Sequence, residues 1–339
     1  MVAPGSSVSD IFFVNSQLVS VITCLMNKID SILKTKYPII QAGMVWCSGW
    51  KLARACSENG ILGVIGSGSM YPEVLDLHLS KYRNACDMPF AVNLPLLYPE
   101  IGAHLESIVK HKVPIVITSA GSPAKYTEVL KSEGIKVIHV VSSTKFAVKA
   151  QNAGVDAVIC EGFEAGGHNG REETTTFCLI PEVRRAVDIP VIAAGGIASG
   201  KAILAARVLG ADGVQIGTRF AASKESSAHQ IYKERVVAAK EGDTVLTLKE
   251  LAPVRLIKNA FYDRVLEGYS KGFTPLQLSS LLGKGRAKKG IFEGDMIEGE
   301  LEIGQIASMV DKIESCQEII HDLVSEYQKE LDNTKNLRF

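Results

Sequence analysis

The chain has 339 residues, of which 46% are hydrophobic and 22% are charged, and its 37 basic and 37 acidic residues give a formal net charge of zero. This composition is typical of a globular enzyme, and the length is enough for one large α/β domain or two ordinary ones. The balanced charge excludes a net field that would draw the chain toward nucleic acid or an anionic membrane, so we expect neither as a partner.

The first apolar segment, IFFVNSQLVSVITCLM at 11–26, has the pattern of neither a membrane span nor a signal peptide. Asn15, Ser16 and Gln17 interrupt it, and no lysine or arginine precedes it. A span needs a longer uninterrupted apolar run, and a signal peptide begins with a basic region. We therefore expect no membrane-spanning segment.

From residue 37 onward, short apolar runs alternate with amphipathic stretches, at the intervals expected of βα units. Eight runs are candidate strands: PIIQAG (38–43), ILGVIG (61–66), PFAVNL (89–94), PIVITSAG (114–121), KVIHVV (136–141), DAVIC (156–160), PVIAAGG (190–196) and GVQIG (213–217). Because they are apolar at nearly every position, both faces are expected to be buried, as in a parallel sheet. The sequence predicts an α/β fold, a (β/α)8 TIM-type barrel, with a doubly wound open sheet as the alternative.

The stretches between the runs are helical in pattern. PAKYTEVLKSEG (123–134) and SGKAILAARVLGA (199–211) place apolar residues at helical spacing, and the first ends in glycine, a common helix stop. The rhythm changes after about residue 235. We expect residues 26–235 and 301–339 to form the barrel with C-terminal helices, and residues 236–300 to form a small, mostly helical lid domain.

The seven cysteines favour neither a disulfide framework nor a zinc site. Their number is odd and no C-x-x-C pair occurs. Reduced thiols in a cytoplasm are the simplest interpretation. Cys160, at the end of the sixth run, is either a nucleophile or, more simply, a small buried hydrophobic residue.

In a barrel of this kind the active site lies at the carboxyl ends of the strands. Small and polar residues gather there after most of the apolar runs. They include Gly43 and Met44, Asn93, Gly195 and Gly196, and the stretch from Gln215 to Thr218. We expect these residues to line one site.

Two glycine-containing loops, AAGGIASG (193–200) and QIGTR (215–219), follow the last two predicted strands, where barrels commonly bind phosphate. Glycine lets backbone N–H groups approach an anion closely, and the Thr218 hydroxyl adds a donor. The alternative is that Gly195 and Gly196 only make a tight turn. Asn93 breaks an apolar strand, and its amide either satisfies neighbouring backbone groups or binds a flat polar ligand.

His168 lies in the glycine-rich loop EGFEAGGHNGREETTT (161–176). Histidine exchanges protons near neutral pH, and its small neighbours leave the ring accessible, so it is the candidate catalytic residue. The alternative is a solvated loop histidine. No second histidine stands at ligand spacing, so we expect no metal site. His229 is a weaker candidate at the mouth of the site.

Six motifs in order, PIIQAGM, PFAVNL, EAGGHNG, PVIAAGGI, GVQIGTRF and KESSAH, give the chain a family resemblance over about residues 26–325. It resembles the flavin-dependent nitronate monooxygenases, formerly 2-nitropropane dioxygenases, and the flavin-containing type II enoyl-acyl-carrier-protein reductases.

The resemblance implies FMN at the top of the barrel beneath a smaller helical domain. It implies that the flavin contacts Gly43, Met44, Asn93, Glu161, Gly166, Gly195, Gly196, Gln215, Gly217 and Thr218, with His168 beside its ring. It also implies that the fold starts near Met26, so that residues 1–25 are an extension outside the fold.

Between the two branches, the resemblance is stronger to the reductases. Glu161 stands where the monooxygenases usually carry glutamine, and the blocks EGFEAGGHNG, TSAGSPAKY and TRFAASKESSAH are closer to those of the reductases. The reductase branch implies NADH or NADPH as co-substrate and an enoyl thioester on acyl carrier protein. The alternatives are a nitronate monooxygenase and a non-redox barrel that binds a phosphorylated ligand; a homodimer is one candidate assembly.

Overall fold

The computed structural model describes residues 28–336, and residues 1–25, expected to be an extension, fall outside this range. Its main sheet has the order β1-β9-β8-β6-β5-β4-β3-β2, with every neighbouring pair parallel. The strands are β1 (Ile39–Gln41), β2 (Gly63–Gly66), β3 (Phe90–Pro95), β4 (Ile115–Ser119), β5 (Lys136–Val141), β6 (Ala157–Glu161), β8 (Val191–Ala194) and β9 (Gly213–Ile216).

The sheet closes on itself. Ile40 and Leu62 form a parallel bridge between the two ends, where the Leu62 N–H donates to the Ile39 carbonyl and the Gln41 N–H donates to the Leu62 carbonyl, each over 2.9 Å. The predicted barrel is therefore confirmed, and the open-sheet alternative is wrong. Six of the eight strands lie within the predicted runs, and β3 and β6 each extend one residue beyond theirs.

The alternation of side chains along each strand divides the core into two layers. Ala91, Ile117, Ile138, Ile159 and Ile192 belong to the cluster inside the barrel. Their neighbours along the chain, such as Val92, Val116 and Val158, pack in a second cluster with the surrounding helices. Because both faces of each strand are buried, each strand occurs in the sequence as a continuous apolar run.

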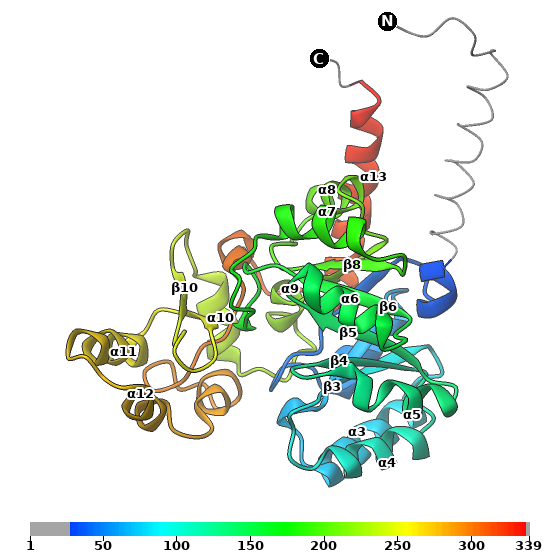
Figure 1. The fold of residues 1–339 in the computed structure, drawn as a ribbon. Helices are drawn as coiled ribbons and strands as arrows, with labels where there is room; N and C mark the ends of the chain where they lie inside the picture. The colour runs from blue at the N-terminus through cyan, green and yellow to red at the C-terminus, as the bar shows by residue number, and fades with distance from the viewer. Residues whose placement is uncertain (1–27, 337–339) are drawn as a thin grey trace, which may run out of the picture.

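Helices cover the outside of the barrel (Figure 1). They are α2 (Trp50–Glu58), α3 (Pro72–Ala85), α4 (Ile101–Lys110), α5 (Thr127–Ser132), α6 (Thr144–Asn152), α7 (Thr176–Ala186), α8 (Gly200–Val208) and α9 (Thr218–Ala221), with short 3-10 turns η1 (Ser67–Ser69) and η2 (Pro123–Lys125). The C-terminal helix α13 (Cys316–Thr334) packs against α8. Their approach requires Gly200, where a Cβ atom would stand 2.1 Å from the Tyr327 backbone nitrogen.

A smaller domain lies beside the barrel, yellow to orange in Figure 1. Its elements are α10 (Gln230–Val237), β10 (Thr244–Thr247), β11 (Val254–Ile257), α11 (Ala260–Ser270), α12 (Pro275–Leu282), a π-helical turn η3 (Lys288–Phe292) and a 3-10 turn η4 (Gln305–Met309). Leu248, Leu256, Phe261, Val265 and Leu278 are among the residues of its own apolar core.

Strands β10 and β11 lie in the segment 236–300, which the sequence predicts to be mostly helical, without these strands. They form an antiparallel pair, and β11 also pairs with β7 (Gly167–His168) of the barrel's glycine-rich loop. Strands of two to four residues are too short to give a distinct alternating pattern, and their pairing depends on contacts between distant segments.

No helix within residues 28–336 is long and apolar enough to cross a membrane. Over the same range, no group of three or more histidine, cysteine or acidic side chains is placed to hold a metal ion. The six cysteines of this range are all free thiols: Cys47, Cys56, Cys86, Cys160, Cys178 and Cys316.

Candidate active site

A cavity of about 790 Å³ opens at the carboxyl ends of the barrel strands. Its size falls in the range of roughly 300–1,000 Å³ that is usual for small-molecule sites. All eleven site residues singled out from the sequence line it: Gly43, Met44, Asn93, Glu161, Gly166, His168, Gly195, Gly196, Gln215, Gly217 and Thr218. The fold thus brings together residues that are up to 175 positions apart in the chain, counted as 218 minus 43.

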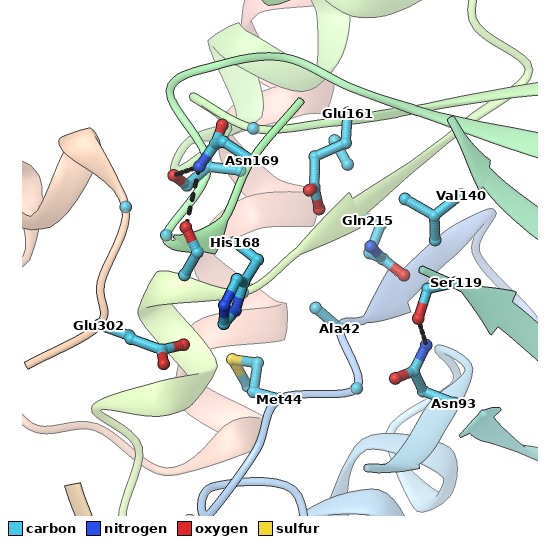
Figure 2. Close-up of a pocket in the computed structure, with 18 of the residues that line it drawn as sticks. Ala42, Met44, Asn93, Ser119, Val140, Glu161, His168, Asn169, Gln215 and Glu302 are labelled. Carbon is cyan, nitrogen blue, oxygen red and sulfur yellow. Dashed lines mark hydrogen bonds between the residues drawn. The ribbon is translucent and has the colours of Figure 1, made fainter. Parts of the chain in front are cut away.

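The floor of the cavity is the uppermost inward-facing layer of the barrel. Side chains from five different strands or strand ends point into it in Figure 2, namely those of Ala42, Asn93, Ser119, Glu161 and Gln215. Ala42, Asn93, Ser119 and Glu161 each stand two residues beyond an apolar position of the barrel interior, so the alternation that builds the core also aims these groups at the cavity.

Three of these floor residues have polar atoms without a hydrogen-bond partner in the described part of the chain. The Asn93 amide nitrogen donates to the Ile117 carbonyl (3.1 Å) and to Ser119 Oγ (3.3 Å), which leaves its amide oxygen unpartnered. The side chains of Glu161 and Gln215 make no hydrogen bond to residues 28–336. Since buried polar groups normally find partners, this floor suits a flat ligand with a polar edge.

Glu161 is half-buried among these groups, and desolvation raises the pKa of its carboxyl from 4.5 to about 7. The cause is desolvation, which disfavours the charged form. At neutral pH a substantial fraction of this side chain therefore carries a proton and can donate as well as accept a hydrogen bond.

The wall above β8 and β9 is a cradle of backbone N–H groups. Gly195 (φ 89°) and Gly196 (φ 68°) take left-handed conformations that favour glycine. Among residues 28–336, their N–H groups and those of Gly217 and Thr218 have no hydrogen-bond partner. The Thr218 hydroxyl accepts from the Gly304 N–H (3.2 Å), so its own hydrogen remains available as a donor.

The cradle suits an anion held by backbone amides. No lysine or arginine is among the described residues that line the cavity. Glu164, the acidic neighbour of Gly196, is already engaged: its carboxylate accepts from the Thr176 backbone N–H (3.0 and 3.1 Å) and from the Thr176 hydroxyl (2.9 Å). Convergent backbone amides bind phosphate without a side-chain cation.

His168 is held at the rim of the cavity by the small domain. Its strand pairs with β11, in register His168 with Val254 and Gly167 with Arg255. The Asn169 amide nitrogen donates to the Ala165 carbonyl (2.9 Å) and the Gly167 carbonyl (3.0 Å), which fixes the loop from within. His168 is exposed at the cavity wall, where its imidazole can meet a bound ligand.

The remaining residues weighed from the sequence take structural places. Cys160 is fully buried, and burial raises the pKa of its thiol to about 12, so it behaves as a small hydrophobic residue. His229 does not line the cavity. It caps the N-terminus of α10, where its Nδ1 accepts from the Ile231 N–H at 3.3 Å.

Sequence reasoning missed Glu302 and Tyr232, which also line the cavity. In GELEIGQ (299–305), Glu302 has the pattern of an exposed charge. Tyr232 lies within the amphipathic helix α10, and its hydroxyl donates to the Glu302 carbonyl over 2.6 Å. No local signal marks either residue, because both reach the site through the packing of the small domain.

The chain is similar to known proteins in sequence and in structure. A family model described as nitronate monooxygenase matches residues 27–104 and 100–326. The chain is similar to a solved structure of FabK from Thermotoga maritima, with a TM-score of 0.86 and 41% identity over 91% of this chain and 98% of that one.

Two curated relatives carry different descriptions. A "probable nitronate monooxygenase" of Staphylococcus saprophyticus is 34% identical, over 78% of this chain and 89% of the relative. A Rhodococcus jostii enzyme described as a 5-hydroxy-7a-methyl-1-oxo-octahydro-1H-indene-4-carboxyl-CoA dehydrogenase is 28% identical, over 93% of this chain and 99% of the relative.

Proposed function

Because the chain belongs to the nitronate monooxygenase family and is thus a flavin-dependent oxidoreductase, we propose that it reduces trans-2-enoyl thioesters with NADH or NADPH. The observation that carries the proposal is the similarity to FabK, which at 41% identity exceeds that to the staphylococcal monooxygenase at 34%. The Rhodococcus relative, whose description names a coenzyme A thioester, supports a thioester substrate. We propose acyl carrier protein as the carrier.

The cavity fits FMN as the resident cofactor. The unpartnered N–H groups of Gly195, Gly196, Gly217 and Thr218 would hold its phosphate, and Asn93, Glu161 and Gln215 would meet the polar edge of its ring. When bound, the flavin supplies hydride transfer from the nicotinamide to the β-carbon of the enoyl thioester.

The chain's own contribution is binding, orientation and proton handling. The apolar side chains of Met44, Ile291 and Ile306 line the cavity together with His168 and suit an acyl group. The His168 imidazole would polarise the thioester carbonyl or hold the proton that the α-carbon receives.

Nitronate oxidation is the competing candidate, favoured by the description of the matching family model. In that reaction His168 would bind the nitronate or remove its proton, and oxygen would be the electron acceptor.

An anaerobic flavin titration tests the proposal. The flavin-loaded protein is mixed with NADH or with NADPH, and the flavin absorbance is followed before crotonyl thioester is added. We expect bleaching by one of the nicotinamides and recovery with the thioester. Bleaching only by an alkyl nitronate would replace the proposal with the monooxygenase. A protein that retains no flavin when FMN is supplied would instead be a non-redox barrel.

A further inference from the structure

The cavity wall beside His168 contains a carboxyl group that the proposed roles leave unused. Glu302 lines the cavity, and its side chain makes no hydrogen bond to any residue in the range 28–336. Figure 2 shows its carboxyl group and the His168 imidazole at the same side of the cavity, with Met44 below them. An unpartnered carboxyl group next to a candidate acid–base residue calls for a role.

The backbone places these two residues side by side. Strand β11 pairs with β10 along one edge. Along its other edge, Val254 pairs with His168, and Leu256 forms an antiparallel bridge with Glu302. A Cβ atom at Gly167 would stand 2.7 Å from Glu302 Oε2, and the φ of Gly167 is +74°. Because Gly167 has no side chain, the carboxyl group of Glu302 can occupy the space next to His168.

A second carboxyl group, that of Glu300, is 6% exposed and stands on the same segment. Burial raises the pKa of both Glu300 and Glu302 above the usual range. The Glu302 charge raises that of Glu300 further, while His168 and Arg286 lower it. Repulsion between two buried carboxylates favours keeping a proton on the pair.

The other titratable groups around Glu302 stay neutral. Cys47 precedes α2, and burial raises the pKa of its thiol to about 12. Tyr232 on α10 is fully buried, which raises its pKa well above the ordinary value. The carboxyl groups of Glu300 and Glu302 are thus the groups beside His168 whose raised pKa lets them exchange protons near neutral pH.

We propose that Glu302 acts through His168 by passing it the proton that the substrate's α-carbon receives. The imidazolium N–H bond breaks as the α-carbon C–H bond forms. A water molecule between the two groups then gives the imidazole a proton, which forms a new N–H bond, while the Glu302 O–H bond breaks and returns a proton to that water. The Glu302 carboxylate regains its proton from solvent. The hydride comes from the reduced flavin, so charge and electrons balance. This inference rests on the proposed function, and Glu302 is a positioning residue in it.

The decisive measurement is an NMR titration of the His168 imidazole in protein labelled at histidine, with and without FMN. The signal is assigned by its loss in His168→Gln. In Glu302→Gln, which keeps the shape of the side chain, we expect the pKa of His168 to fall by about 1 unit, because a nearby carboxylate stabilises the imidazolium. Glu128→Gln, which changes an exposed glutamate on α5, should leave it unmoved.

A rapid-mixing experiment separates this inference from the proposed function. Glu302→Gln should leave the bleaching of flavin by the nicotinamide within about twofold of the wild type. It should slow recovery with crotonyl thioester about tenfold and alter its pH profile. This is less than the roughly 100- to 10,000-fold contribution of a direct general acid or base, because Glu302 acts through His168. Glu302→Asp, which retains an acid, should restore part of the rate. Wild-type protein that is not bleached would contradict the proposed function alone, since the NMR titration remains valid.

Two results would overturn the inference: an identical His168 titration in Glu302→Gln and the wild type, or unchanged recovery and pH profile in the variant. If Glu302→Gln fails to fold, the wild-type titration decides. Coupled groups give the imidazole signal two steps, and a single-step curve would contradict the coupling.

Discussion

Gly43 lies so close to Asn93 that a Cβ atom at position 43 would stand 2.3 Å from the Cβ of the asparagine. Gly43→Ala must therefore displace the amide that donates to Ile117 and Ser119. We expect the free energy of unfolding to fall by about 1–3 kcal/mol, the usual cost of overpacking, and flavin binding to weaken. Urea unfolding and flavin absorbance after gel filtration measure the two effects.

Gly102→Ala is the matched control for this substitution. No atom lies within 4 Å of the added Cβ, and the residue is in α4, where alanine is preferred to glycine. Its stability should equal or slightly exceed that of the wild type. Equal urea midpoints for Gly43→Ala and Gly102→Ala would show that the Asn93 side chain moves aside without loss of stability, which would contradict the prediction.

Thr218→Val tests the phosphate cradle. The substitution keeps the shape of the side chain. It removes the hydroxyl hydrogen that a phosphate would accept and the oxygen that accepts from the Gly304 N–H. We expect the Kd for FMN to rise about 10- to 150-fold, equivalent to about 1.5–3 kcal/mol for a hydrogen bond to a charged group. Quenching of flavin fluorescence gives the Kd. Thr218→Ser should bind nearly as well as the wild type, and equal affinity in all three proteins would remove Thr218 from the site.

The half-buried Glu161 makes the free energy of unfolding depend on pH. Its pKa rises from 4.5 to about 7 on folding, so between these values the folded protein binds a proton that the unfolded chain has released. The stability from this group is complete below pH 4.5 and is lost as the pH rises through 7. Glu161→Gln should therefore stabilise the flavin-free protein by about 1–3 kcal/mol more at pH 8 than at pH 5. Equal gains at the two pH values in urea unfolding would contradict it.

The ion pair between Arg219 Nη2 and Glu314 Oε2 (2.7 Å) is enclosed, with side-chain exposures of 13% and 6%. Arg219→Gln leaves a buried carboxylate with only Lys312 beside it. We expect a loss of about 2–3 kcal/mol in the free energy of unfolding. Arg54→Gln breaks an exposed pair with Glu58, and we expect it to cost under about 0.5 kcal/mol. A similar cost for both would mean that burial does not matter here.

Thiol alkylation distinguishes the two cysteines nearest the glycine-rich loop in the sequence. Cys178 is exposed, whereas Cys160 is buried with its pKa raised to about 12. Iodoacetamide at pH 8 should label Cys178 in the native protein and Cys160 only after unfolding, as read by mass spectrometry of peptides. Cys160→Ala should keep flavin binding, and rapid native labelling of Cys160 would reopen its candidacy as a nucleophile.

The barrel could be predicted because its strands are buried on both faces, so each is written in the sequence as a continuous apolar run. The site followed from the rule that the carboxyl ends of such strands converge, and all eleven candidates do line one cavity. The resemblance added the family. Strands β10 and β11 escaped detection because four residues at a domain edge carry no period of their own.

Glu302 could not have been found from the sequence. Its neighbours Glu298 and Glu300 make the segment a plain acidic stretch, and Glu298 does pair with Arg264 and Arg286 at partly exposed positions. Only the pairing of β11 with two separate segments moves one of these glutamates to the imidazole. Which charge of a polar stretch turns inward is set by tertiary contacts rather than by local pattern.

The β11–β7 pairing makes the histidine loop a shared part of both domains. A chimaera that exchanges the small domain between homologues must therefore include residues 163–170 from the same homologue. Otherwise strand β11 of one homologue would have to pair with β7 of the other. The His168 imidazole would then lose its alignment even though every barrel residue had been retained.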